Sequence, residues 1–495
     1  MKHTIKWVAL LLSALLLFSM TGCTLVIEEE VVSTRVIEPS TSSTATTTTT
    51  TAATDTDGST VTSDATGTQT KATTTTRKPA ETRTEPKLSG KLELQIFTNE
   101  SQTADGGWTN VINAFEDATG ISVNAQIGSS VNTMMSKRWQ KGDPPDMIWL
   151  DGSGIPDQQY EKAGSFYDLS KLFNDGYVYG TTDKIKDVVD NNLVQKNGGK
   201  IYRLPVLSTA GGMWYDARFM SNNGFSVPQN FDQLMALGAQ AKAKGYSTMT
   251  YTGIYSSYAL SNVIAPAVAA YGQSYFDQFL SGSAAAVKDA RFKKVMQKFA
   301  DFCRTDGYLM EGSTTMDHTS TQQRWINHAT LLIANGLWLP DETRKLWSQK
   351  SFDMAWAPSP LIDADQKQTV AISGKNVAVA TKAKNLDNAL AFVRFLYRDE
   401  AQNWLMYSYG YMGVRTDMKF DTDAFVKAAG GTDAAKATAT ALDYINGNKV
   451  NRVYWNESWG TLGDEIALEI NELAMKGGKS VDEAIDRLAS VAPKK

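Results

Sequence analysis

Hydrophobic and polar positions along most of the chain repeat with two different periods. Leu92, Leu94 and Ile96 are separated by single residues, which is the period of a strand, whereas residues 108–115 carry apolar side chains at three- and four-residue spacing, the period of a helix. Residues 121–127 return to the alternation of a strand. A strand, a helix and a second strand in succession predict the beginning of an α/β sheet.

Later segments continue this succession of strands and helices. The turn at residues 142–145 contains two prolines and leads into the apolar run 147–150. Because proline does not fit a helix interior, this run is predicted to be a buried strand. Apolar residues at helical spacing predict a helix over 386–397, and Ser480 with Glu483 has the capping-box pattern that begins a last helix.

The N-terminal residues have the pattern of a secretory signal. Lys2 and Lys6 precede the hydrophobic run 7–18, which is short for a membrane span. Cys23 follows a Thr-Gly pair and resembles the lipobox of bacterial lipoproteins, which implies cleavage before Cys23 and a diacylglycerol thioether on its sulfur. Residues 1–22 are therefore predicted to be a lipoprotein signal peptide, and an ordinary signal peptide with an incidental cysteine is the alternative.

Residues 23–88 are predicted to be the lipid anchor and a disordered tether. The stretch 33–85 consists mainly of Thr, Ser and Ala with scattered charges and almost no apolar residues. Such a segment cannot bury enough surface to offset the entropy of ordering it. A lipid at one end and a folded body at the other predict a receptor on the outer face of a cell membrane. A Thr-rich tether of this length indicates an envelope of the Gram-positive type.

The composition of the chain bears on which chemistries the body supports. It is 42% hydrophobic and 21% charged with a net charge of -4, and nothing in this balance indicates nucleic-acid binding. Cys303, the second of two cysteines, lies on an apolar helical face and is predicted to be a core residue. His318 and His328 lack the spacing of a helical zinc pair. We predict no metal and no cofactor.

A series of short motifs runs in order through the body. They lie at residues 115–123 (FEDATGISV), 142–151, 163–169 (AGSFYDL), 202–216, 333–338 (IANGLW) and 372–397. Together they resemble the sugar-binding group of the extracellular solute-binding proteins, family 1, which feed ABC transporters. The chain departs from the family pattern at Asp216, where Asn is commoner, and at residues 331–333, which replace the usual Ala-Met. The order and spacing of the motifs are specific to the superfamily and fix no ligand.

The resemblance implies an α/β, periplasmic-binding-protein-like fold of two lobes, with a ligand cleft between them and hinge crossings. Residues 89–210 plus 369–412 would form lobe 1, and residues 211–368 plus 413–495 would form lobe 2. The implied function is the substrate-binding component of an ABC importer. A monomer would capture a carbohydrate, an oligosaccharide rather than a monosaccharide, close around it and deliver it to the permease subunits.

Candidate ligand contacts follow from the chemistry of sugars and from the family motifs. Aromatic rings cover the apolar face of a pyranose, and polar side chains bond to its hydroxyls. Ligands in open sheets lie beyond the carboxyl ends of the strands. The predicted contacts are Asn99, Glu100, Trp149, Asp151, Trp214, Tyr255, Trp338, Gly374, Arg415 and Trp455. For each ring the alternative is a place in the core, and for the polar residues it is a cap or a solvated turn.

Other functions stay open at this point. The ligand of such a cleft can be a small molecule that is not a sugar, or the protein can capture glycans without a transporter. Asn456-Glu457 resembles the acid/base site of retaining glycosidases, which need a second carboxylate about 5 Å away. Those enzymes build an eightfold strand-helix barrel, to which the motifs above have no counterpart. We therefore predict that the protein is not an enzyme.

Overall fold

The computed structural model describes residues 35–37, 80–98, 104–152, 156–347, 351–447, 450–455 and 461–492. Contacts divide the chain into two units, Met1–Ser33 and Thr34–Lys495, and every described residue belongs to the second. None of the helices in the described ranges combines the length and the apolar composition that crossing a bilayer requires.

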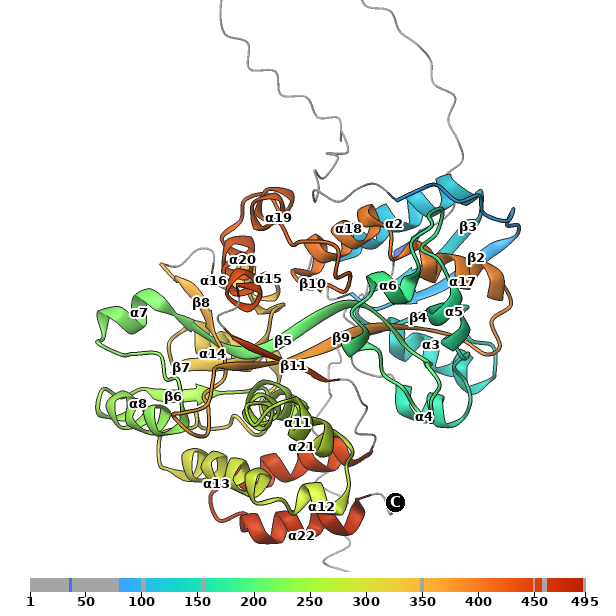
Figure 1. Ribbon diagram of the computed structural model, residues 1–495. Coiled ribbons are helices and arrows are strands. Elements are labelled where there is room, and N and C mark those ends of the chain that lie inside the picture. Colours follow the sequence, from blue (N-terminus) through green and yellow to red (C-terminus); the bar gives the residue numbers. More distant parts are fainter. Residues whose placement is uncertain are drawn as a thin grey trace, which may run out of the picture. The chain divides into compact units, whose positions relative to one another are not determined.

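The described strands form one mixed sheet (Figure 1). They are β1 (Arg35–Ile37), β2 (Lys91–Ile96), β3 (Ser122–Ile127), β4 (Met147–Leu150), β5 (Leu204–Asp216), β6 (Ser247–Thr250), β7 (Thr330–Gly336), β8 (Met354–Ala357), β9 (Thr369–Val379), β10 (Met412–Gly413) and β11 (Asn451–Trp455). The order along the sheet is β1-β3-β2-β4-β9-β5-β7-β6, and β10 and β8 pair with β5 while β11 pairs with β9. The parallel pairs are β2 with β3 and β4, β6 with β7, and β11 with β9, whereas β1 is antiparallel to β3.

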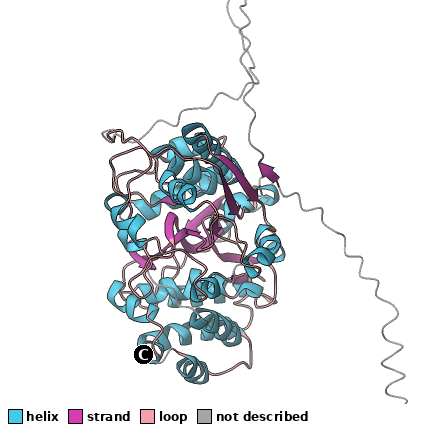
Figure 2. Ribbon diagram, turned by 90° about the vertical axis from the view of Figure 1, so that its right-hand side faces the viewer, coloured by secondary structure: helices cyan, strands magenta, loops and turns pink. Residues whose placement is uncertain are grey.

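Two long strands connect the two ends of the sheet. β5 and β9 pair with each other in antiparallel register, and β9 also pairs with β4 while β5 also pairs with β7. Figure 1 shows these two strands running between the group that contains β2 to β4 and the group that contains β6 to β8. In the perpendicular view of Figure 2, the strands pass through the middle of the described part, with helices on both sides. The fold class is therefore α/β.

Helices cover the strands throughout the chain. In the first part they are α2 (Ala104–Thr119), α3 (Val131–Gln140), α4 (Asp157–Lys162), α5 (Ser170–Asp175), α6 (Ile185–Val188), η1 (Asn191–Leu193), α7 (Ala217–Asn222) and α8 (Phe231–Ala243). The middle part has η2 (Gly253–Tyr255), α9 (Ser257–Ala259), the π-helical η3 (Leu260–Ile264), α10 (Ala265–Ala269), α11 (Gln273–Leu280), α12 (Ala284–Val287), α13 (Ala290–Arg304) and α14 (His318–Ile326). The last part has α15 (Leu339–Glu342), α16 (Arg344–Trp347), α17 (Leu386–Phe395), α18 (Asp399–Tyr409), α19 (Thr422–Ala428), α20 (Asp433–Asn446), α21 (Thr461–Ala474) and α22 (Val481–Val491).

The predicted periodicities correspond to two hydrophobic cores. One core joins β2 to β4 with α2, α17 and α18, and contains Leu94, Phe115 and Phe392. The other joins β6 with α8, α13, α21 and α22, and contains Phe299 and Ile470. Each of these side chains is fully buried, because strand alternation and helical spacing place them on the covered face of their element.

The helix ends and the cysteine also agree with the sequence patterns. The capping box of α22 is confirmed, since the Ser480 hydroxyl accepts from the Glu483 amide and the Glu483 carboxylate accepts from the Ser480 amide. Cys303 is buried in the second core, and burial raises the pKa of its thiol far above the ordinary value. A thiol in that state is a poor nucleophile, so Cys303 is a packing residue.

Residues 80–88, which we call the strap, are bonded to the loop between α5 and α6. The Arg83 amide donates to the Gly180 carbonyl at 3.1 Å, and the Thr182 amide donates to the Glu81 carbonyl at 3.0 Å. The Glu85 carboxylate accepts two hydrogen bonds from the Arg394 guanidinium, at 2.5 and 2.8 Å. The strap therefore belongs to the folded body, although it falls within the segment that composition assigns to the tether.

Glu85→Gln is expected to lower the free energy of unfolding by roughly 1–2 kcal/mol at pH 7. Burial raises the pKa of Glu85, but hydrogen bonds from Arg394 and the Gly180 amide outweigh it, and the net pKa lies below the ordinary value. A carboxyl with a depressed folded pKa stabilises the protein above its unfolded pKa, and this contribution is lost as the pH falls through the folded pKa. The difference in melting temperature between wild type and variant should therefore decrease as the pH is lowered from 7 to about 3.5.

A matched control for this prediction is Glu400→Gln, because Glu400 pairs with Arg398 at the surface and its side chain is 59% exposed. We expect the control to melt like wild type at both pH values. A melting difference for Glu85→Gln that stays constant with pH would show that the ion pair is not its cause.

Candidate ligand-binding site

A cavity of about 370 Å³ is lined by residues that follow strands of both groups. This volume falls within the usual range for small-molecule sites. The lining residues are mostly aromatic and charged: Phe97, Asp151, Gly152, Tyr255, Ser257, Tyr258, His318, Trp338, Glu342, Lys375 and Tyr411.

Strand ends bring these residues together. Phe97 follows β2 directly, and Asp151 follows β4, so both lie at the carboxyl ends of neighbouring parallel strands. Trp338 follows β7, and Lys375 lies within β9, which is adjacent to β4 in the sheet. The cavity is thus located where open α/β sheets bind ligands.

An ion pair forms the polar wall of the cavity. The Lys375 ammonium lies 2.7 Å from Oδ1 of Asp151, and both side chains are less than one-fifth exposed. The loop that carries Asp151 is fixed from behind, because the Asn132 side-chain amide donates to the Asp151 carbonyl at 2.9 Å. Asn132 in turn accepts from Gln95, which accepts from the Trp139 indole. The backbone that carries the Asp151 carboxylate is therefore held in place before any ligand arrives.

Aromatic rings form the apolar wall. The Trp338 ring contacts the rings of Tyr258 and Tyr411 edge to face, with centroids 6.1 and 6.3 Å apart. The Lys375 ammonium lies 5.2 Å from the Trp338 centroid and 5.5 Å from the Tyr411 centroid. Tyr255 is near both Tyr258 and His318, each with a centroid 6.4 Å away.

Tyr258 and Tyr411 remain protonated at neutral pH. Burial raises the pKa of the Tyr258 and Tyr411 hydroxyls well above the ordinary value, and the carboxylates of Asp151 and Glu342 raise it further. A neutral phenol both donates and accepts a hydrogen bond. The cavity thus combines flat apolar surfaces with hydroxyl, carboxylate and ammonium groups. Within the described residues, no three His, Cys, Asp or Glu side chains are grouped so as to hold a metal ion.

Two glycines leave room for rings of the cavity. Gly152 has φ +74°, and a Cβ there would overlap the Phe97 ring. A Cβ on Gly336 would overlap the six-membered ring of Trp338. The Gly336 carbonyl accepts a hydrogen bond from the Trp214 indole at 2.9 Å, which fixes the backbone on which the Trp338 ring lies.

Gly336→Ala is expected to displace the Trp338 ring and to weaken ligand binding by about tenfold. Because the position is fully buried, the added methyl group should also cost about 1–3 kcal/mol of stability through overpacking. Calorimetric titration and thermal melting measure the two effects separately. Gly106→Ala is the control, since a Cβ there meets nothing within 4 Å, and it should leave affinity unchanged and raise stability slightly.

The structure brings together three of the residues predicted from sequence. Asp151, Tyr255 and Trp338 line the cavity. Asn99 and Glu100 lie outside the described residues. The cavity also contains residues that the sequence patterns did not single out, namely Phe97, Tyr258, His318, Glu342, Lys375 and Tyr411.

Four other predicted contacts are not among the lining residues: three are tryptophans that pack against other parts of the chain, and one is a glycine within a strand. Trp149 is fully buried, with its ring 5.4 Å from that of Trp108. Trp214 is fully buried and bonded to Gly336. Gly374 lies within β9, opposite Ser208 of β5. Trp455, at the end of β11, packs edge to face on Phe276.

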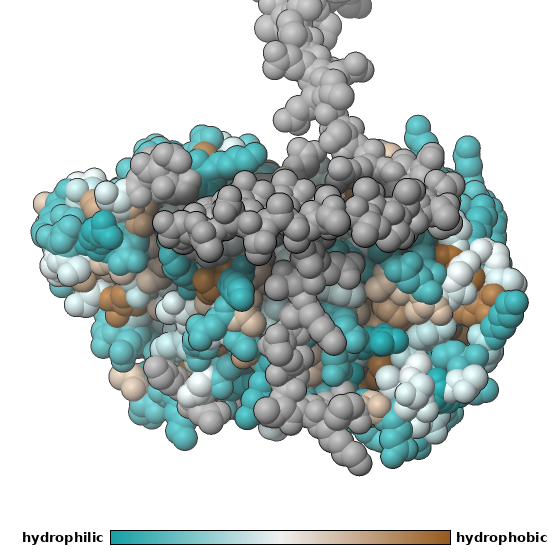
Figure 3. Space-filling view, turned by 90° about the horizontal axis from the view of Figure 1, so that it is seen from above, coloured by the Kyte–Doolittle hydropathy of each residue, from teal (hydrophilic) through white to brown (hydrophobic). Residues whose placement is uncertain are grey.

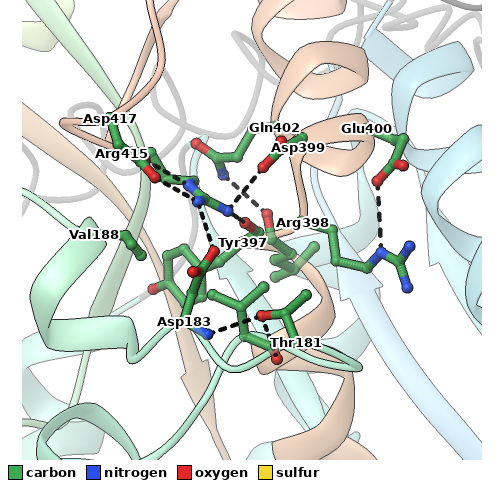
Figure 4. A network of polar contacts seen from close by, with 12 residues as sticks. Thr181, Asp183, Val188, Tyr397, Arg398, Asp399, Glu400, Gln402, Arg415 and Asp417 are labelled. Carbon is green, nitrogen blue, oxygen red and sulfur yellow. Dashed lines mark hydrogen bonds and ion pairs between the residues drawn. The ribbon is translucent and has the colours of Figure 1, made fainter. Parts of the chain in front are cut away.

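Arg415 is the fifth predicted contact that does not line the cavity, and it has a structural environment of its own (Figure 4). Its side chain is 1% exposed, and its guanidinium pairs with Asp183, Asp399 and Asp417 at 3.2, 3.0 and 2.8 Å. It also donates to the Tyr397 carbonyl at 2.6 Å. With every direction of the guanidinium fork occupied, Arg415 anchors the segment after β10 and offers no donor to a ligand.

Comparison with known families decides the class of this protein. The sequence profile of the family described as bacterial extracellular solute-binding proteins matches residues 99–403. The chain belongs to this family. Its members are binding proteins of the cell exterior, and the resemblance that the sequence motifs indicated is confirmed.

Individual relatives have low sequence identity to this chain, but the aligned segments are long. The multiple sugar-binding protein of Streptococcus mutans is 20% identical over 402 residues, 80% of this chain and 89% of the relative. The diacetylchitobiose binding protein NgcE of Streptomyces coelicolor is 24% identical over 251 residues, 48% of this chain and 51% of the relative. The structure of apo RafE from Streptococcus pneumoniae superposes with a TM-score of 0.59 at 17% identity and covers 82% of this chain and 98% of RafE. The two-lobed fold of solute-binding proteins is thereby confirmed.

Proposed function

We propose that this solute-binding protein is the substrate-binding component of an ABC importer that captures a carbohydrate at the cell surface. The observation that carries the proposal is the cavity, in which the Asp151–Lys375 pair lies beside the rings of Trp338, Tyr258 and Tyr411. A pyranose has apolar C–H faces and a rim of hydroxyls. Rings would cover the faces, and the ion pair would bond to the hydroxyls at the rim.

An oligosaccharide fits better than a monosaccharide. The names of two similar proteins refer to sugars of more than one ring. One is a diacetylchitobiose binding protein, and the other, RafE, has a structure in complex with raffinose. In this chain, Ile254 and Tyr255 are exposed at 50% and 39%, and Tyr255 lines the cavity. The surface seen in Figure 3 is mostly hydrophilic with smaller hydrophobic areas, a pattern that is usual for protein surfaces. Two neighbouring exposed apolar residues beside the cavity would therefore offer a surface for a further sugar ring.

Binding would close the protein around its ligand. Of the lining residues, Phe97, Asp151 and Lys375 belong to lobe 1 as proposed from sequence, and Tyr258 and Trp338 belong to lobe 2. A ligand that contacts both sets would favour a closed arrangement, with the crossing segments as the hinge. The closed form would then be presented to the permease subunits of the transporter.

The location on the membrane would come from the N-terminal residues. We propose that lipid on Cys23 anchors a monomer to the outer face of a Gram-positive type of membrane and that the tether ends at the strap. Cys23 lies outside the described residues. The support for this proposal is the sequence pattern of basic residues, a hydrophobic run and a cysteine after Thr-Gly.

The protein would bind and release its ligand without changing it. Membership in a family of binding proteins supports this. Glu457, the residue that a glycosidase would require, lies outside the described residues. A solute-binding protein for a small molecule other than a sugar is the alternative, and the charged wall of the cavity is the feature that favours it.

A thermal-shift screen of the full chain tests the proposed function. The panel contains mono- and oligosaccharides, amino acids, polyamines and short peptides. A ligand that binds only the folded state raises the melting temperature by mass action. We expect a rise with one family of oligosaccharides. A rise with amino acids, polyamines or peptides and none with sugars would keep the fold and overturn the ligand.

A further inference from the structure

The ammonium group of Lys375 is held in a corner of the cavity by three other lining residues. Asp151 contributes a carboxylate oxygen at 2.7 Å, and Trp338 and Tyr411 contribute ring faces at 5.2 and 5.5 Å. The two rings meet at 75° with centroids 6.3 Å apart, so the ammonium is located in the angle between them. We call these three side chains, Asp151, Trp338 and Tyr411, the ammonium corner.

A carboxylate beside two aromatic faces is a general recognition site for organic cations. Cation–π attraction acts within about 6 Å of a ring centroid, and it strengthens when the cation is removed from water. The Lys375 side chain is 18% exposed and that of Asp151 is 16% exposed, so the pair is largely withdrawn from solvent. The corner therefore has the chemistry to bind an alkylammonium ion, and the chain supplies one of its own.

The parts of the corner are fixed independently of Lys375. Asp151 is held through Asn132 and through the Gly152 amide, which donates to Oδ1 at 3.0 Å. Trp338 lies over Gly336 and against Tyr258, and Tyr411 stacks on Tyr409 with centroids 5.3 Å apart. Lys375 itself is placed by the pairing of β9 with Leu207 of β5. Removal of the lysine side chain would therefore leave the corner in place and empty.

We propose that Lys375 is a specificity-determining residue, which fills the ammonium corner with the chain's own cation and thereby excludes amine-bearing solutes. This deepens the proposed function and rests on it, because the corner is part of the same cavity. With Lys375 in place, the ammonium group of a diamine or an amino acid is repelled by the lysine charge at the ammonium corner, which would otherwise bind it. A neutral carbohydrate meets hydrogen-bond donors and ring surfaces and pays no such penalty.

The test replaces the lysine and supplies its missing part from solution. Lys375→Ala removes Cγ, Cδ, Cε and Nζ, and n-propylamine has the same three carbons and ammonium group. Thermal unfolding of the full chain in non-ionic detergent is followed by intrinsic fluorescence at pH 7, with and without n-propylamine, and with n-propanol as the uncharged probe of equal length. Lys375→Thr opens the same corner with a residue that suits a strand, and it serves if the alanine variant does not fold.

The expected result is selective rescue. Lys375→Ala should melt several degrees below wild type, and n-propylamine should raise its melting temperature by about 2 °C or more. N-propanol should not raise it, and wild type should respond to neither probe. Adding Asp151→Asn to Lys375→Ala should abolish the response, and so should Lys375→Met, whose side chain fills the corner without charge. An equal response of wild type to n-propylamine, or no response of either opened variant, would overturn the proposal.

The same samples separate this proposal from the proposed function. If wild type responds to no sugar in the screen while the opened variants bind n-propylamine, the carbohydrate proposal fails and the ammonium corner stands. If wild type binds an oligosaccharide and the opened variants ignore n-propylamine, the proposed function stands and the role of Lys375 in excluding amines is wrong.

Discussion

Trp338→Ala is expected to raise the dissociation constant for the bound oligosaccharide by at least about thirtyfold, or roughly 2 kcal/mol. The ring is at the centre of the apolar wall, where it contacts Tyr258, Tyr411 and the Lys375 ammonium. Its removal would take away a flat surface for the sugar and the support of the two neighbouring rings. Isothermal titration calorimetry with the oligosaccharide from the screen measures the change.

Two controls define what this loss means. Trp338→Phe keeps a smaller aromatic face and should lose less than the alanine variant. Trp149→Phe changes a tryptophan that is fully buried against Trp108 and is not part of the lining. It should leave the affinity within about threefold of wild type, which is less than 1 kcal/mol. If Trp149→Phe weakened binding as much as Trp338→Ala, the cavity would not be the ligand site.

Arg415→Ala is expected to cost roughly 3 kcal/mol of folding free energy. The substitution would leave the carboxylates of Asp183, Asp399 and Asp417 facing one another without the buried cation between them. Breaking such a pair is costly because like charges remain partly withdrawn from water. Urea unfolding followed by circular dichroism measures the change as a shift in the unfolding midpoint.

The neighbouring residue Arg398 is the matched control, and Figure 4 shows it beside the same network. Arg398 pairs with Glu400 at 3.5 Å, and both side chains are at least one-third exposed. Arg398→Ala should therefore change stability by less than about 1 kcal/mol. If Arg415→Ala reduced sugar affinity at low temperature while stability was unaffected, Arg415 would be a ligand contact after all.

The elements of the fold could be predicted from sequence where a single local pattern determines them. Leu92, Leu94 and Ile96 alternate because successive side chains of β2 point to opposite faces and these three face the hydrophobic core. Ser480 and Glu483 form a capping box because helix ends need partners for their amides. The order of strands in the sheet has no such local signal. β9 lies between β4 and β5, and only long-range pairing places it there.

The candidate site shows the same division. Asp151 and Trp338 follow buried strands, and a strand end next to a polar or aromatic residue is visible in the sequence. Lys375 lies within a strand, where a lysine usually indicates a solvated position, so its place beside Asp151 could not be predicted. Trp149 and Arg415 are the opposite case. Both residue types suit sugar binding, but Trp149 packs in the core and Arg415 belongs to a buried ion network.

The most direct test of the central claim is a crystal structure of the protein with the oligosaccharide that the screen identifies. We expect sugar in the cavity, with one ring against Trp338 and hydroxyls within hydrogen-bond distance of Asp151 or Lys375. Sugar bound elsewhere on the chain, with this cavity empty, would contradict it.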